Sequence, residues 1–149
     1  MKINFVEKII GSGFFSGYIP FAPGTMGSLV GLGIFMIPGF ENPTLMLSLI
    51  LVFTLMGVYV ANKFEQVYGK DPSICVVDEI IGTWISLLFL PKEIFVIAVA
   101  FIIWRLLDIF KPPPIGLMEK ISGGWGIMLD DIVAGLITLV IVQLGLFLL

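Results

Sequence analysis

The sequence predicts an all-α fold: an integral membrane helical bundle of about four to five spans, with an additional N-terminal helix in the membrane interface. Of the 149 residues, 58% are hydrophobic and only 13% are charged. A typical soluble domain carries about 25% charged residues, roughly twice as many. The mean hydropathy of the chain is +1.11. Several apolar segments also reach the length of a membrane span. The length fits a single domain, residues 1–149.

The first ten residues predict a short amphipathic helix. Apolar side chains recur there at helical spacing, at Ile3, Val6, Ile9 and Ile10. Such a pattern suits a helix that lies in the interface plane rather than one that spans. Glu7 and Lys8 interrupt the apolar stretch, so we expect no cleavable signal peptide.

Five further segments are candidates for membrane spans. A spanning helix needs about 20 mostly apolar residues. Residues 44–62, 93–110 and 127–149 satisfy this requirement well, and 74–90 and 25–39 satisfy it less well. Because 25–39 is short and glycine-rich, we expect it to be a tilted or incomplete span.

The distribution of lysine predicts the orientation of these spans. With a cytoplasmic N-terminus, five spans place most of the basic residues on the cytoplasmic side, namely Lys2, Lys8, Lys63, Lys70, Lys111 and Lys120. Arg105 then lies about a turn and a half inside the membrane, and only Lys92 falls outside. This asymmetry agrees with the positive-inside rule and predicts an N-in, C-out topology.

The same topology brings acidic residues from distant segments to one depth. They lie near the cytoplasmic ends of three predicted spans and comprise Asp78, Glu79, Asp108, Asp130 and Asp131. The turn at 20–28, PFAPGTMGS, enters its span from the same side. A carboxylate near hydrocarbon normally faces the bundle interior and has a partner. Their convergence therefore predicts a site close to the inner surface of the membrane.

The stretch WRLLDIFKPPPI adds positive charge at that depth. Arg105 and Asp108 are three residues apart on one helix and can pair on one face. Lys111 follows about a turn later, where three consecutive prolines must end the helix because they lack backbone donors. The rigid exit should hold Lys111 in place.

The residue types present restrict the chemistry. The chain has no histidine, which excludes Ser-His and Cys-His nucleophiles and HExxH zinc sites. Carboxylates without histidine or thiolate favour hard cations, Mg²⁺ first. Mg²⁺ commonly shares phosphate oxygens with basic residues, so Arg105 and Lys111 are expected phosphate ligands. Thr25 and Ser28 could donate to the same anion at a helix start.

Each of these features also has a purely structural interpretation. An Arg-x-x-Asp pair at a helix end is often only an intrahelical ion pair, and acids at span ends are common anchors. The two glycine-rich turns, APGTMGS and SGGWG, are by themselves ordinary turns before a span. SGGWG is expected to be the loop that brings Asp130 and Asp131 over the site. Five acids, an arginine and a lysine at one depth together favour a functional site.

Four motifs in order resemble one family. APGTMGSL (22–29), VVDEIIGTW (76–84), WRLLDIFKPPPI (104–115) and GGWGIMLDDIVAGL (123–136) are similar to the motif set of the phosphatidylglycerophosphatase A family. The resemblance implies a magnesium-dependent removal of the terminal phosphate of phosphatidylglycerophosphate in bacterial inner membranes. It also implies that the family's acidic positions are the five acids named above, that its basic positions are Arg105 and Lys111, and that its N-terminal turn contains Thr25 and Gly27.

These expectations combine into one mechanistic hypothesis. One or two Mg²⁺ ions held by Glu79, Asp108 and Asp130 or Asp131 would clamp the phosphomonoester, while Arg105 and Lys111 neutralise its oxygens. A water molecule would then attack phosphorus. A phospho-aspartyl intermediate on Asp78 or Asp108 remains an alternative. We expect phosphatidylglycerophosphate in the bilayer as the partner, and no nucleic acid.

Three other functions compete with this hypothesis. A small cation transporter or channel would also use intramembrane acids, but its polar residues should extend through the depth of the bilayer. Here the middles of 44–62 and 93–110 are nearly free of polar residues. A structural membrane subunit would tolerate Asp108→Asn. A transferase for CDP-activated headgroups would need a spaced Asp-Gly, Gly and Asp pattern on one helix, which is absent from the sequence.

Overall fold

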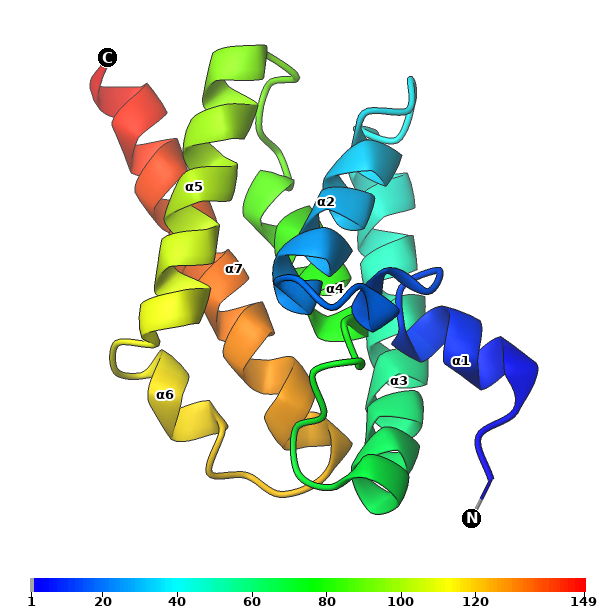
Figure 1. The fold of residues 1–149 in the computed structure, drawn as a ribbon. Helices are drawn as coiled ribbons and strands as arrows, with labels where there is room; N and C mark the ends of the chain where they lie inside the picture. Colours follow the sequence, from blue (N-terminus) through cyan, green and yellow to red (C-terminus); the bar gives the residue numbers. More distant parts are fainter. Residues whose placement is uncertain (1) are drawn as a thin grey trace.

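The structure, a computed structural model, describes residues 2–149 and is all-helical in that range (Figure 1). The predicted all-α class is therefore confirmed. The seven α-helices of the described residues are α1 (Phe5–Gly11), α2 (Pro23–Phe35), α3 (Pro43–Tyr68), α4 (Val77–Leu87), α5 (Ile94–Phe110), α6 (Ile115–Met118) and α7 (Gly124–Leu148). A single 3₁₀ turn at Ser16–Tyr18 connects α1 to α2.

Two helices, α3 and α7, are long and apolar enough to cross a membrane. They have 26 and 25 residues. Helix α3 extends beyond the predicted segment 44–62 at both ends, whereas α7 begins before the predicted segment 127–149 and ends at Leu148. Large apolar side chains cover their outer faces; Leu51 and Leu55 of α3 are 62% and 58% exposed. Helix α5 matches the predicted segment 93–110 within one residue and has 17 residues.

The two weaker predicted spans form short helices. Helix α2 has 13 residues rather than the predicted 25–39, and α4 has 11 rather than 74–90. At a rise of 1.5 Å per residue, α4 covers only about 16 Å, which is half of a hydrocarbon core. Among the residues that the structure describes, two helices have the length and hydropathy of a span, so the predicted four to five spans are not confirmed.

Helix α4 lies inside the bundle rather than against lipid. All of its residues except Glu79 are buried. It packs against α7, α2, α3 and α5, and Figure 1 shows it at the centre of the molecule. A continuous apolar run is what a fully buried helix requires, and hydropathy alone does not distinguish such a helix from a short span.

Despite these lengths, the chain runs back and forth in the predicted order. In Figure 1, α2, α4 and α7 run toward the end of the bundle that carries the C-terminus, and α3 and α5 run the opposite way. The starts of α2 and α4 lie near mid-height, below which α3, α5 and α7 continue. The N-termini of α2 and α4 thus lie part-way along the long helices rather than at the end of the bundle.

The helix ends near the prolines follow the sequence. Helix α5 ends at Phe110, and Lys111 adopts a left-handed conformation with φ of 46°. The predicted stop at KPPPI is therefore confirmed. The prediction that SGGWG forms a loop is wrong in part, because α7 already begins at Gly124. A Cβ atom on Gly124 would lie 2.0 Å from the Val58 carbonyl oxygen, so the glycines let the first turn of α7 pack directly on α3.

The predicted N-terminal helix is present as α1. Asn4 and Glu7 form a capping box, in which each side chain bonds the other residue's backbone N–H. Glu7 also accepts a 2.5 Å bond from Lys63, which attaches α1 to α3. Phe5 and Val6 are exposed.

Candidate active site

Three carboxylates form the centre of the site. One oxygen each of Asp78, Asp130 and Asp131 lies within 4.8 Å of the others. Asp78 is in the first turn of α4, and the two other aspartates are in the second turn of α7. All three are buried, with exposures of 7%, 4% and 2%. The first turn of the short helix α4 therefore packs against the side of the long helix α7.

The other two predicted acids border this group. Asp108 of α5 is 8% exposed and lies beside the Asp131 carboxylate. Glu79 lies next to Asp78 in the chain, and Gly24 is close to both Glu79 and Arg105, the ion-pair partner of Asp108. The structure thus brings all five predicted acids together. The tightest group contains Asp78, whereas the predicted metal ligands were Glu79, Asp108, Asp130 and Asp131.

Several oxygens of this cluster have no hydrogen-bond partner among the described residues. They are Asp78 Oδ1, Glu79 Oε2 and Asp131 Oδ2. Buried carboxylate oxygens without a partner are costly, and buried acids are normally paired or bind metals. An all-oxygen set of this kind fits a hard divalent cation such as Mg²⁺. Asp78 and Asp131 could hold it through their free oxygens, and Asp130 through the oxygen nearest them.

Arg105 provides the positive charge next to the acids. It forms the predicted ion pair with Asp108, and its Nη2 donates to Thr25 Oγ1 at 3.3 Å. Its Nε has no partner among the described residues. The guanidinium also lies over the Trp104 ring, 5.2 Å from the centroid. It is therefore held in position from two helices and still has a donor available.

The start of α2 reaches the cluster, as the sequence predicted. Gly24 lies so close to Glu79 that a Cβ atom there would be 2.5 Å from Oε1 and 3.5 Å from Arg105 Nη2. Only glycine permits this approach without a shift of the carboxylate. Thr25 therefore stands at the site. Ser28 is fully buried, and its hydroxyl donates to the Gly24 carbonyl at 2.7 Å, so that proton is already engaged.

Lys111 is bound to acids on both sides. Its Nζ donates to Asp130 Oδ2 at 2.6 Å and to Glu119 Oε1 at 2.5 Å. Burial acts to lower the pKa of Lys111, but the bonds to Asp130 and Glu119 outweigh it and raise the pKa above its ordinary value. A charged Lys111 thus fixes one of the three central carboxylates.

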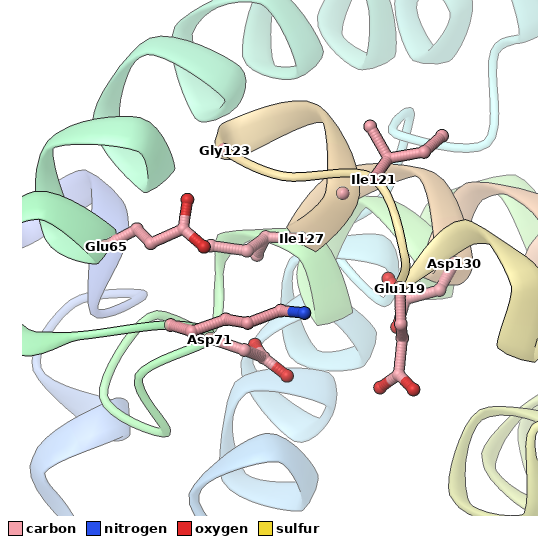
Figure 2. A pocket seen from close by; sticks show the side chains of 9 residues that line it. Glu65, Asp71, Glu119, Ile121, Gly123, Ile127 and Asp130 are labelled. Carbon is pink, nitrogen blue, oxygen red and sulfur yellow. The ribbon is translucent and has the colours of Figure 1, made fainter.

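A polar pocket of about 310 Å³ adjoins the cluster (Figure 2). Asp130 belongs to both, and Figure 2 shows side chains from several elements converging on the space. The lining residues are Glu65, Lys70, Asp71, Glu119, Ile121, Gly123, Gly126, Ile127 and Asp130. Sequence reasoning missed Glu65, Asp71 and Glu119, and it used Lys70 only for orientation. The sequence offers one signal for these residues: each lies in a segment that borders one of the four motifs.

A buried carboxylate cluster beside a fixed arginine is typical of the active site of an enzyme that acts on a phosphorylated substrate. The family model described as Phosphatidylglycerophosphatase A matches residues 9–146. The chain belongs to the phosphatidylglycerophosphatase A family, and it is a phosphatase.

Curated bacterial relatives cover nearly the whole chain. A Bacteroides thetaiotaomicron protein named "Putative phosphatidylinositol-3-phosphatase" is 39% identical over 95% of this chain and 94% of its own. Proteins named Phosphatidylglycerophosphatase A from Escherichia coli and Haemophilus influenzae are 38% and 36% identical. These two alignments cover 93% and 95% of this chain, and 82% and 90% of the relatives. No solved structure matches the chain.

Proposed function

We propose that the protein is a Mg²⁺-dependent lipid phosphatase of the bacterial inner membrane. It hydrolyses the terminal phosphomonoester of phosphatidylglycerophosphate to give phosphatidylglycerol and inorganic phosphate. One observation carries the proposal: a chain of this family has buried carboxylates with unpartnered oxygens, on Asp78, Glu79 and Asp131, and Gly24 is close to both Glu79 and Arg105. Two of the relatives bear the name of this activity.

The acids and bases have complementary roles in the proposed reaction. Asp78, Asp130 and Asp131 hold Mg²⁺, with Glu79 and Asp108 beside them. When bound, Mg²⁺ supplies Lewis-acid stabilisation of charge on the phosphoryl oxygens. Arg105 presents its planar fork, and the free Nε donor, to the same oxygens. Lys111 keeps Asp130 in position and adds positive charge at the rim.

The remaining proton chemistry falls to the acids bordering the trio. Glu79 Oε2 is buried and without a partner, so it is available to orient a water molecule for attack on phosphorus. Thr25 and the free backbone N–H groups at the start of α2 lie beside Arg105, where they can bind a non-bridging oxygen. The burial of the cluster excludes bulk water, which strengthens each of these interactions.

Charge and hydropathy support the proposed placement in the membrane. The beginnings of α4 and α7, which carry the acids Asp78 and Asp130, lie on the half of the bundle away from the α4–α5 loop, which contains Lys92. The ends of α3 and α5 and the segment before α7, which contain Lys63, Lys111 and Lys120, lie on that same half. The positive-inside rule therefore favours a cytoplasmic site. The exposed Phe5 and Val6 of α1 favour an interfacial position for that helix. A lipid phosphate at this depth would meet the cluster directly.

The assay for this proposal is phosphate release by the purified protein. We expect release from phosphatidylglycerophosphate with Mg²⁺, and almost none after chelation. Phosphatidic acid, whose phosphate is attached directly to diacylglycerol, should be a much poorer substrate. Equal rates with and without Mg²⁺ would refute the metal assignment.

A second substrate is favoured by one relative. Its printed name specifies an inositol lipid phosphorylated at position 3. Both substrates are phosphomonoesters on a polyol headgroup, so phosphatidylinositol 3-phosphate belongs in the same assay. A cation transporter is not favoured, because the described acids of the site gather at one level of the bundle and the relatives are named as phosphatases.

A further inference from the structure

Two helices of the site repeat one spacing. On α4, Asp78 is followed four residues later by Gly82, and on α7, Asp131 is followed by Gly135 at the same spacing. Residues four apart lie on one face of a helix, about 6 Å apart along its axis. Because α4 and α7 run in the same direction, each glycine lies on the same side of its aspartate (Figure 1). The two glycines thus form a level of the bundle next to the carboxylates.

At this level the backbones of α4 and α7 are in direct contact. A Cβ atom on Gly135 would lie 2.8 Å from the Gly82 carbonyl oxygen and 3.1 Å from the side chain of Ile85. Ordinary contacts between carbon and a carbonyl oxygen begin at about 3.3 Å. The oxygen belongs to the backbone and Ile85 is buried, so neither can move aside easily. Glycine at position 135 therefore permits the close approach of α4 and α7 one turn away from Asp78 and Asp131.

Trp104 fixes the third helix, α5, at the same level. It is fully buried, and a Cβ atom on Gly82 would lie 2.6, 2.8 and 2.9 Å from Cζ2, Nε1 and Cε2 of its indole ring. Trp104 also packs in one buried cluster with Ala134, the residue before Gly135. It precedes Asp108 by four residues, whereas the two glycines follow their aspartates, because α5 runs in the opposite direction.

These residues are locally unfavourable choices. Glycine inside a helix is less stable than alanine. The indole Nε1 of Trp104 has no hydrogen-bond partner among the described residues, and phenylalanine would fill the same space without an unpaired donor. Local choices that conflict with stability are found mainly at functional sites. Their place beside the carboxylates indicates that they serve the geometry of the site.

We propose that Gly82, Gly135 and Trp104 are positioning residues of the site, and that the contact at Gly135 sets which cation fits between Asp78 and Asp131. Mg²⁺ binds oxygen at about 2.0–2.1 Å and Ca²⁺ at about 2.3–2.6 Å. Two ligands on opposite sides of Ca²⁺ are therefore roughly half an ångström or more farther apart. A methyl group on residue 135 would require a similar separation, about half an ångström, to reach an ordinary contact.

The contact between Gly82 and Trp104 acts on the other half of the site. Arg105 follows Trp104 in the chain, and its guanidinium lies 5.2 Å from the centre of that ring. Asp108, the ion-pair partner of Arg105, is one turn away on the same helix. A larger residue at position 82 would push α5 away from α4, and with it the guanidinium that neutralises the phosphate. This contact therefore controls phosphate binding rather than the choice of cation.

The first test is Gly135→Ala in the full-length purified protein. Gly145→Ala is the matched control on the same helix, because its added carbon has nothing within 4 Å. Titration calorimetry measures the dissociation constants of Mg²⁺ and Ca²⁺. We expect Gly135→Ala to weaken Mg²⁺ binding about tenfold and to change Ca²⁺ binding less than about twofold, with neither changed in the control. Equal weakening of both ions, or no change in either, would overturn the role of Gly135, since a merely structural residue would not alter their ratio.

The second test is Gly82→Ala, alone and combined with Trp104→Phe. We expect Gly82→Ala to raise the inhibition constant of inorganic phosphate about tenfold, with the ratio of the Mg²⁺ and Ca²⁺ constants within about twofold of wild type. Trp104→Phe removes the indole edge that the new methyl group would meet, so the double variant should recover most of the phosphate binding. A double variant that binds phosphate no better than Gly82→Ala would contradict this role of Trp104.

The inference rests on the proposed function, and the two can fail separately. A wild-type protein that binds no Mg²⁺ and releases no phosphate from phosphatidylglycerophosphate would reject both. A wild type that binds Mg²⁺, with variants indistinguishable from Gly145→Ala, would reject the positioning roles alone. If a thermal scan shows that Gly135→Ala does not fold, the comparison of Gly82→Ala with its double variant decides, because it tests the same level of the bundle.

Discussion

The two ends of the bundle carry their charges in opposite ways. At one end, Lys92 and Glu41 form a 2.9 Å ion pair with side chains 21% and 43% exposed. At the other, Asp78, Asp130 and Asp131 bring three carboxylates within 4.8 Å in the interior. Lys111 neutralises one of them, while Asp78 and Asp131 keep oxygens without a partner.

This difference separates a stabilising feature from a functional one. In an exposed ion pair each charge has its partner, and the pair contributes little to stability. Unpaired carboxylates in the interior reduce stability, and such costly features are found mainly at functional sites. We therefore place catalysis at the end of the bundle where the unpaired carboxylates reduce stability.

The largest effect should follow removal of a central carboxylate. We expect Asp131→Asn, and separately Asp78→Asn, to lower kcat about 10³-fold, because each removes a predicted Mg²⁺ ligand. The thermal unfolding midpoint should not fall, since an unpaired buried charge has also been removed. Phosphate release and a thermal scan measure the two effects. Retention of more than a tenth of the wild-type rate would be incompatible with a ligand role.

A smaller loss is expected for Arg105→Lys. The substitution keeps the charge but removes the planar fork that joins Asp108 and Thr25 to the substrate. We expect kcat to fall about 10²-fold. Steady-state kinetics with saturating Mg²⁺ measure it. Lys8→Arg serves as a control for purification and assay, because Lys8 of α1 forms no ion pair with the described residues. Full activity of the lysine variant would show that Arg105 is only a structural ion pair.

Gly24→Ala should have an intermediate effect through geometry alone. The new methyl group would lie 2.5 Å from Glu79 Oε1 and would displace that carboxylate. We expect kcat to fall about tenfold, since small displacements of catalytic groups are costly. Gly33→Ala on the same helix has nothing within 4 Å of the added carbon and is the matched control. Equal activity of the two variants would show that α2 does not contribute to the site.

The smallest effect belongs to the opposite end. Glu41→Gln breaks the exposed ion pair with Lys92 but touches no part of the site. We expect kcat and KM to equal those of the wild type, with at most a slight change in the unfolding midpoint. The same phosphate assay and thermal scan apply. A large loss of activity would contradict the division of the molecule into a structural end and a catalytic end.

Much of this fold follows from the sequence, and the errors have physical causes. Span-length apolar runs at 44–62 and 127–149 correctly predicted α3 and α7, and the triple proline correctly ended α5. Hydropathy overestimated 25–39 and 74–90, because a helix buried by neighbouring helices and a helix buried by lipid have the same composition.

The site was predictable as a group of residues but not in its contacts. Lysine bias and span order brought the five acids together without coordinates. The tightest group of three contains Asp78 rather than Glu79 because of the rotation of α4 about its own axis. That rotation is set by packing against the neighbouring helices. The bond from Lys111 to Glu119 and the pocket lined by Glu65 and Asp71 depend on how the connecting segments fold over the end of the bundle.

Binding of Mg²⁺ to the purified protein, measured by titration calorimetry, tests the central assignment most directly. We predict that the wild-type chain binds Mg²⁺ and that the triple variant Asp78→Asn, Asp130→Asn, Asp131→Asn does not, although it remains folded. Binding of Mg²⁺ by the triple variant as tightly as by the wild type, or no binding by either, would contradict it.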